Sequence, residues 1–165
     1  MFLRRIIKNR SAVLAQPFRL VVVLFIASAI IFLFSLILPA LLADTQFQEI
    51  DKEIDSILLE SASMYEYAYE GSHVTLYVNF PATLRYIVFG SLPAATSVEP
   101  VNRTLDENTS NNCYYVTNDG TIRSFHTSNR FSSYNMTEFC VFHSGSYKIT
   151  LELRQKEGQT YVTFS

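Results

Sequence analysis

The most constraining feature of the chain is an uncharged apolar run from Leu20 to Leu42. It is 23 residues long, and 17 of these are Leu, Ile, Val or Phe. A helix of that length extends about 34 Å, slightly more than the hydrocarbon thickness of a bilayer, which is about 30 Å. The sequence therefore predicts one transmembrane helix, with the lipid bilayer as its first partner.

The charges around this run predict its orientation. Residues 1–19 contain no acidic residue, whereas the basic residues there are Arg4, Arg5, Lys8, Arg10 and Arg19. The positive-inside rule therefore predicts a single-pass protein with a cytoplasmic N-terminus and an extracytoplasmic C-terminal domain. The alternative is a cleaved secretory signal, although the apolar core of such a signal is usually only about 7 to 15 residues long.

A helical pattern continues beyond the apolar run. Apolar and small residues recur there at steps of three and four, as in a heptad seam: Phe47, Ile50, Ile54, Ile57, Ser61, Met64 and Ala68. We expect Gly71 to cap the C-terminal end of this helix. Residues 44–70 also carry eight acidic residues against one lysine, so the outer face is either solvated or a surface for cations or a basic partner.

After Gly71 the apolar period changes from helical to alternating, which predicts short strands. We expect seven antiparallel strands: 74–80, 84–89, 113–117, 121–125, 139–143, 147–154 and 161–164. The segment Asn118-Asp119-Gly120 indicates a hairpin turn, and residues 91–112 are expected to form a long exposed loop. The fold class predicted is α+β, with the helix followed by a small antiparallel β-sandwich or twisted sheet packed against it.

These patterns divide the chain into four parts. They are a basic cytoplasmic leader (1–17), a transmembrane helix (18–43), an acidic amphipathic stalk helix (44–70) and an extracytoplasmic β domain (71–165).

The only two cysteines, Cys113 and Cys140, lie in expected strands of the exported domain. In an oxidising compartment we expect them to form a disulfide. The alternatives are two free thiols in the core, or a zinc site completed by His126 and His143, whose spacing matches no metal motif.

Three acceptor sequons for N-glycosylation occur in expected loops on the exported side. Their asparagines are Asn102, Asn108 and Asn135. Each matches Asn-x-Ser/Thr, a short motif that also arises by chance, so the sequence offers three candidate sites for sugar.

Catalysis, cofactor binding and nucleic-acid binding are not predicted. No nucleophile is paired with a base, the chain has only 5 glycines and no phosphate-binding loop, and His73, His126 and His143 are scattered. Seven basic residues balance seven acidic ones after residue 70, so no basic patch for nucleic acid is expected. Tyr65, Tyr67 and Tyr69 are expected to pack the helix against the head, with carbohydrate or partner contact as the alternative.

The segment Ala15-Gln16-Pro17-Phe18-Arg19-Leu20-Val21-Val22, which leads into a long apolar and then amphipathic helix, resembles the N-terminal region of archaeal type IV pilin-like proteins. The resemblance covers about residues 8–70. It implies an external β-rich head and removal of the leader by a prepilin peptidase, between Ala15 and Gln16. The chain departs from the family pattern at Leu14, where a charged residue is usual, and at Leu20, where many pilins carry glutamate.

The leading hypothesis is a structural or accessory subunit of a type IV pilus-like filament or secretion system. The helix would then associate with other subunits or envelope components through Phe47, Ile50, Ile54 and Ile57. The alternative is a permanently anchored extracytoplasmic β-sandwich that binds the cell envelope or a ligand.

Overall fold

The computed structural model describes residues 3–93 and 98–165. Its first element is a single helix, α1 (Leu3–Tyr67), 65 residues long. Eight strands follow: β1 (His73–Phe80), β2 (Leu84–Phe89), β3 (Asn112–Thr117), β4 (Ile122–His126), β5 (Phe131–Ser133), β6 (Cys140–Phe142), β7 (Gly145–Lys156) and β8 (Gln159–Phe164). The chain divides into two compact units, residues 1–45 and 46–165. The last third of α1 thus belongs to the same unit as the strands, here called the head.

The strands of the head form two four-stranded sheets. Sheet A has the order β1-β7-β8-β5 and sheet B the order β4-β3-β2-β6. All pairs are antiparallel except β5 and β8, which run parallel. The α+β class with a β domain is therefore confirmed, while the expectation of a wholly antiparallel domain is wrong because of this one pair.

The helical seam predicted from the sequence is the face of α1 that the head buries. Ile50, Ile54 and Ile57 have no exposed surface, and they join one core cluster with residues of both sheets. Ser61 and Met64, which lie seven residues after Ile54 and Ile57 respectively, continue the buried face. We expected Phe47, Ile50, Ile54 and Ile57 to associate with other subunits or envelope components. The three isoleucines do not have the exposed surface that this needs, because the head of the same chain covers them.

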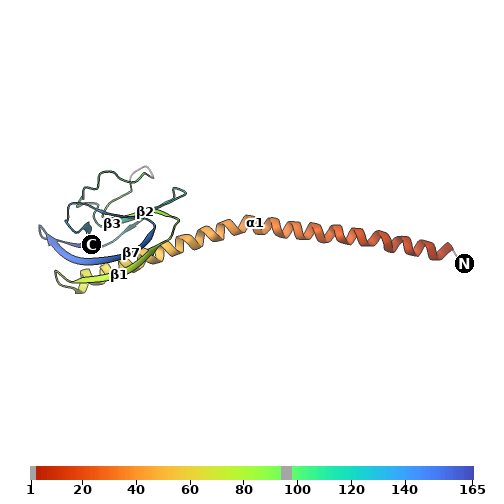
Figure 1. Cartoon of the computed structure of the whole chain (residues 1–165), viewed down its shortest axis with the longest axis horizontal. Helices are drawn as coiled ribbons and strands as arrows, with labels where there is room; N and C mark the ends of the chain where they lie inside the picture. The colour runs from red at the N-terminus through yellow and green to blue at the C-terminus, as the bar shows by residue number, and fades with distance from the viewer. Residues whose placement is uncertain (1–2, 94–97) are drawn as a thin grey trace. The chain divides into compact units, whose positions relative to one another are not determined.

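α1 lies beside the edge strands of both sheets. Asp51 of α1 reaches Arg123 in β4, and Glu53 accepts a long hydrogen bond of 3.4 Å from the backbone N–H of Asn79 in β1. Figure 1 shows β1 running alongside the C-terminal part of α1. At the edge of β1 the helix engages one backbone N–H, whereas four of the five residues of β4 remain exposed.

At the side away from α1 the two sheets approach each other directly. Gly90, just after β2, has φ +99°, and a Cβ atom there would lie 2.6 Å from the backbone oxygen of Phe131 in β5. Only glycine tolerates both the backbone conformation and the close approach. Aromatic rings fill the interior next to this contact, with Phe89 packed 4.9 Å from Phe164 and 5.5 Å from Phe131, centroid to centroid.

Seven of the eight strands coincide with the expected ones to within a few residues. The strand that was not expected is β5, which has only three residues and follows no alternating pattern. The helix ends at Tyr67, before the expected cap, and Gly71 lies instead in the turn to β1 with φ +85°. The turn between β7 and β8 is made by Glu157 and Gly158, both with positive φ, as a two-residue hairpin requires.

We predict that the helical face decides the stability of the head. Ile54→Ala should lower the free energy of unfolding by about 2 to 4 kcal/mol, because it leaves a cavity in a fully buried site. Leu59→Ala is the matched control on the same helix, since Leu59 is 72% exposed and its loss should cost less than about 0.5 kcal/mol. Urea unfolding of the full chain in detergent, followed by near-ultraviolet circular dichroism, measures both. Equal effects at the two sites would contradict this packing.

Candidate functional sites: the apolar helix and the helix–head junction

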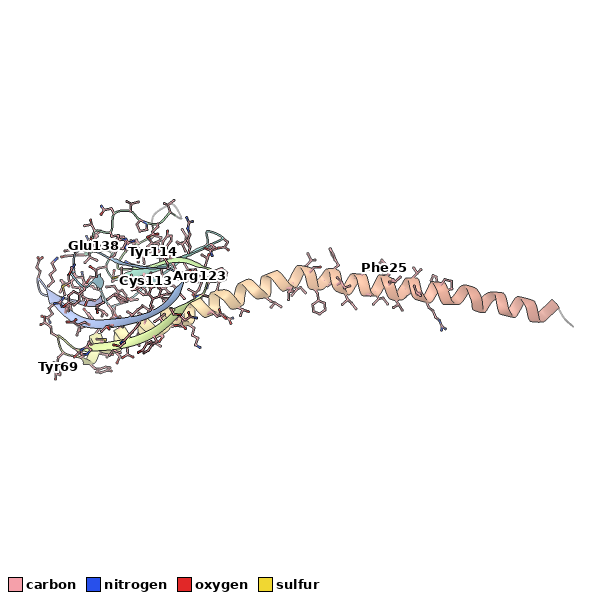
Figure 2. All side chains as sticks on the ribbon, viewed as in Figure 1. Phe25, Tyr69, Cys113, Tyr114, Arg123 and Glu138 are labelled. Atoms are coloured by element: carbon pink, nitrogen blue, oxygen red, sulfur yellow. The ribbon has the colours of Figure 1, made fainter. Side chains whose placement is uncertain are left out.

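The segment Pro17–Leu38 of α1 is long and apolar enough to span a membrane by length and composition, and none of it is buried. Its side chains project freely from the helix, as Phe25 does in Figure 2, where it is 74% exposed. A secretory signal near an N-terminus has the same composition, so this property alone does not determine topology. We call Pro17–Leu38 the apolar segment.

The two serine side chains within the apolar segment are satisfied by the helix itself, and the segment's one charged residue, Arg19, lies near its N-terminal end. Ser28 Oγ donates to the carbonyl oxygen of Phe25 at 2.8 Å, and Ser35 Oγ donates to that of Ile31 at 2.7 Å. A bilayer core supplies no water, so every polar group in it needs an internal partner. These two serines are therefore compatible with a lipid environment.

The junction between α1 and sheet B is organised by the carboxylate of Asp51. One oxygen accepts a hydrogen bond of 2.9 Å from the hydroxyl of Tyr115 in β3, and the other pairs with Arg123 Nη1 in β4, also at 2.9 Å. The Arg123 guanidinium lies 4.6 Å from the ring centroid of Phe47, a cation–π contact with the preceding turn of α1. The position of Arg123 at the helix side of the head is visible in Figure 2.

Burial, and next the hydrogen bond to Asp51, raise the pKa of Tyr115, so its hydroxyl stays protonated and remains a donor. The Tyr115 ring also stacks on Phe125 at 6.1 Å, which holds the hydroxyl towards the helix. A second polar contact joins α1 to the head, because the buried Asn129 donates to Ser61 Oγ at 3.1 Å. These contacts anchor the helix in one register against the head.

The sequence did not identify this junction. Asp51 and Tyr115 are separated by 64 residues, and Asp51 looked like one of many acidic residues on a solvated face. The available signal was its position directly beside Ile50 on the apolar seam, where an acidic side chain falls at the margin of the buried face.

The cysteines do not form the expected disulfide, and both are free. Phe89 in β2 pairs with Cys113 of β3 on one side and with Cys140 of β6 on the other. Because adjacent strands are about 4.8 Å apart, the two cysteine Cα atoms are separated by about 9 to 10 Å. A disulfide requires less than about 7 Å. The disulfide prediction is therefore wrong, because a strand lies between the two residues.

Both thiols belong to the core cluster or pack against it, and Figure 2 places Cys113 inside the head. Burial raises the pKa of each to about 12. A thiolate is the reactive form, so these thiols are inert in the folded head. The described residues also contain no cluster of three or more His, Cys, Asp or Glu suited to a metal ion, and the zinc alternative gains no support from the structure.

The three sequon asparagines, Asn102, Asn108 and Asn135, are all exposed in loops of the head. They lie between β2 and β3 or between β5 and β6, at separate places along the chain. The hydroxyl residues of the second and third sequons differ in exposure: Ser110 is fully buried, whereas Thr137 is exposed. In space the sequons of Asn102 and Asn135 are neighbours, because Thr104 pairs with Glu138 and the N–H of Leu105 donates to the carbonyl oxygen of Thr137 at 2.9 Å.

The histidines and tyrosines give mixed outcomes. His73, His126 and His143 are exposed, as expected for surface positions. Tyr67 and Tyr69 are 76% and 87% exposed, so the expectation that they pack the helix against the head is wrong. Figure 2 shows Tyr69 at the rim of the head. The processing candidates Ala15 and Gln16 lie in helical backbone, but their side chains fall outside the described ones.

Two shallow grooves flank the exposed face of α1 in the head. One is lined by helix residues including Asp51, Lys52 and Asp55 together with Tyr77 of β1. The other lies between the helix and Thr127–Asn129. Both are open to solvent, and neither encloses a nucleophile with a base. Comparisons with known proteins found no match among family models, curated proteins or solved structures.

We predict that the two thiols are free and shielded. Without reductant, iodoacetamide at pH 8 should modify neither cysteine in the folded protein within minutes and both after unfolding in urea, as counted by intact mass. Because the folded pKa values are raised, the stabilisation from protonated thiols is present below the unfolded pKa of about 9 and is lost as the pH rises towards 12. Modification that appears only after a reductant is added would contradict the strand register.

We predict a smaller contribution from the hydroxyl at the junction. Tyr115→Phe should lower the free energy of unfolding by about 0.5 to 1.5 kcal/mol, because it removes one hydrogen bond to a carboxylate that water can partly replace. Tyr77→Phe is the matched control, since Tyr77 is 79% exposed. Urea unfolding of the full chain in detergent compares the two variants, and a loss no larger than that of the control would refute the role of this contact.

Proposed function

We propose that the chain is a membrane-anchored, pilin-like subunit of a surface filament or a related secretion apparatus, with the head outside the membrane. The observation that carries the proposal is α1. One helix supplies both the uncovered apolar segment and the buried seam of the head, so membrane anchoring and head folding depend on the same element.

The uncovered surface of the apolar segment requires a partner. Large apolar side chains lie all around it, including Phe25, Ile31 and Phe34 at 74%, 69% and 67% exposure. Contiguous apolar surface of this kind is stable in lipid or against other apolar helices, but not in water. A bilayer before assembly and neighbouring copies of the same segment in a filament would each satisfy that requirement.

The burial of the seam changes the proposed subunit contacts. Ile50, Ile54 and Ile57 are committed to the chain's own core, so in this proposal association between subunits uses the apolar segment. Residues 44–70 contain one basic residue, Lys52, against five in residues 1–19, and this difference in Lys and Arg supports the outer side of the membrane for the head.

A permanently anchored binding module is the second candidate. The observation that favours it is the exposure of three tyrosines, Tyr67, Tyr69 and Tyr77, at 76%, 87% and 79%. Tyrosine is enriched at contact surfaces because it offers a rigid ring and one polar group. This candidate needs the whole of α1 as an uncleaved anchor. The two candidates therefore differ in the first residue of the mature protein, which is Gln16 for the pilin-like subunit and Met1 for the binding module.

We predict that the mature protein extracted from membranes begins at Gln16. Ala15→Phe should retain Met1, because a bulky residue replaces the small one before the expected cut, while Ala12→Phe is the matched control that should still be processed. Intact mass and N-terminal sequencing measure the outcome. A wild-type chain that keeps Met1 and disperses as a monomer in mild detergent would favour the binding module, and a start beyond Leu42 would indicate a cleaved signal.

A further inference from the structure

We propose that Asn102 is the N-glycosylated residue of the head and that Asn108 and Asn135 remain unmodified. The inference rests on the proposed function, because the sugar donor and its transferase act on the exported side of a membrane. It follows from the different ways in which the folded head presents its three sequons.

The sequon at Asn102 is folded on itself and faces solvent. Asn102 Oδ1 accepts hydrogen bonds from the backbone N–H of Thr104 at 3.1 Å and from its hydroxyl at 2.6 Å. Both residues are exposed, and the preceding Val101 is 97% exposed. Asn102 Nδ2 makes no hydrogen bond to the described part of the chain. The backbone of the sequon is bridged to the next loop, because Thr104 pairs with Glu138 and the carbonyl oxygen of Arg103 accepts from the N–H of Phe139 at 2.9 Å. The side chains of Asn102 and Thr104 nevertheless both lie at the surface, unlike those of Ser110 and Met136 in the other two sequons.

The same hydrogen bonds favour the chemistry. In the transfer, Nδ2 attacks the anomeric carbon of a lipid-linked sugar diphosphate, and a C–N bond forms. The C–O bond to the diphosphate breaks, the lipid diphosphate leaves with the electron pair, and one Nδ2 proton passes to a base of the transferase. Two donors on Oδ1 draw electron density from the amide and raise the acidity of that proton, so they assist the proton loss rather than the attack by the nitrogen.

The sequon at Asn108 lacks an accessible hydroxyl. Ser110 has no exposed surface, and its hydroxyl donates to the carbonyl oxygen of Glu107 at 2.8 Å. Its own carbonyl oxygen accepts from the backbone N–H of Phe131 at 2.8 Å, where β5 begins. Asn108 Nδ2 is also engaged, with Asp106 Oδ1 at 3.3 Å. Recognition of this sequon would require the loop and the start of β5 to unfold.

The sequon at Asn135 is held in a tight turn by its middle residue. Met136 is only 8% exposed and has φ +54°. Its carbonyl oxygen accepts from Lys156 Nζ at 3.0 Å, and its N–H donates to the carbonyl oxygen of Ser133 at 2.9 Å. A transferase would have to pull this buried side chain out of the head before it could bind the sequon.

The test is the intact mass and glycopeptide map of the full chain purified from the membranes of the cells that produce it. We expect one glycan, at Asn102, which is lost in Asn102→Gln and Thr104→Ala and kept in Thr104→Ser. Asn108→Gln and Asn135→Gln are the matched controls and should not change the glycan mass. Near-ultraviolet circular dichroism verifies that each variant is folded.

Protease applied to the outside of intact cells separates this inference from the proposed function. If the head is digested but Asn102 is unmodified, or if Asn108 or Asn135 carries sugar, the glycan assignment is overturned and the placement of the head stands. If the head is protected in intact cells and digested after lysis, the proposed function and the glycan assignment both fail.

Discussion

The head depends on one buried helical face inserted between the edges of two sheets. Ile50, Ile54 and Ile57 lose all their exposure there, and each buried side chain of this size contributes about 1.5 to 3 kcal/mol. The same helix contacts both edge strands, through the backbone N–H of Asn79 in β1 and the side chain of Arg123 in β4. A fragment that began at His73 would lack both the core residues and these contacts, so the last third of α1 is part of the β domain in physical terms.

The polar contacts around that face have a different role from the apolar ones. An ion pair as exposed as Asp51–Arg123, with side chains 28% and 44% accessible, adds little to stability by itself. Its geometry is nevertheless specific, because Tyr115 and Arg123 take different oxygens of one carboxylate. Together with the buried Asn129–Ser61 bond, it selects one rotation and one register of the helix, which hydrophobic burial alone would leave degenerate.

Most of the fold could be predicted from the local periodicity of apolar residues in the sequence. The seam from Phe47 to Met64 and the alternation in β1 and β7 were visible because each repeats over many residues. β5 was missed because three residues carry no period, and its parallel pairing with β8 depends on contacts far apart in the chain. The cysteine error has the same origin. The sequence placed Cys113 and Cys140 in strands, but it did not show that β2 lies between those two strands in the sheet. The order of strands in a sheet is not a local property.

Because the seam is buried in the head, contacts between subunits would have to use the apolar segment, and this restricts the forces that can stabilise an assembly. If the apolar segment is covered by lipid in one state and by helices of other copies in another, both surroundings are equally apolar, and the hydrophobic effect favours neither. The difference between the two states must then come from side-chain packing, backbone approach and the release of lipid. Ser28 and Ser35 already bond to their own helix, so they supply little attraction between helices without first breaking those bonds. Assembly through this segment would therefore depend on shape complementarity among Leu, Ile, Val and Phe side chains, and on partners that act on the head.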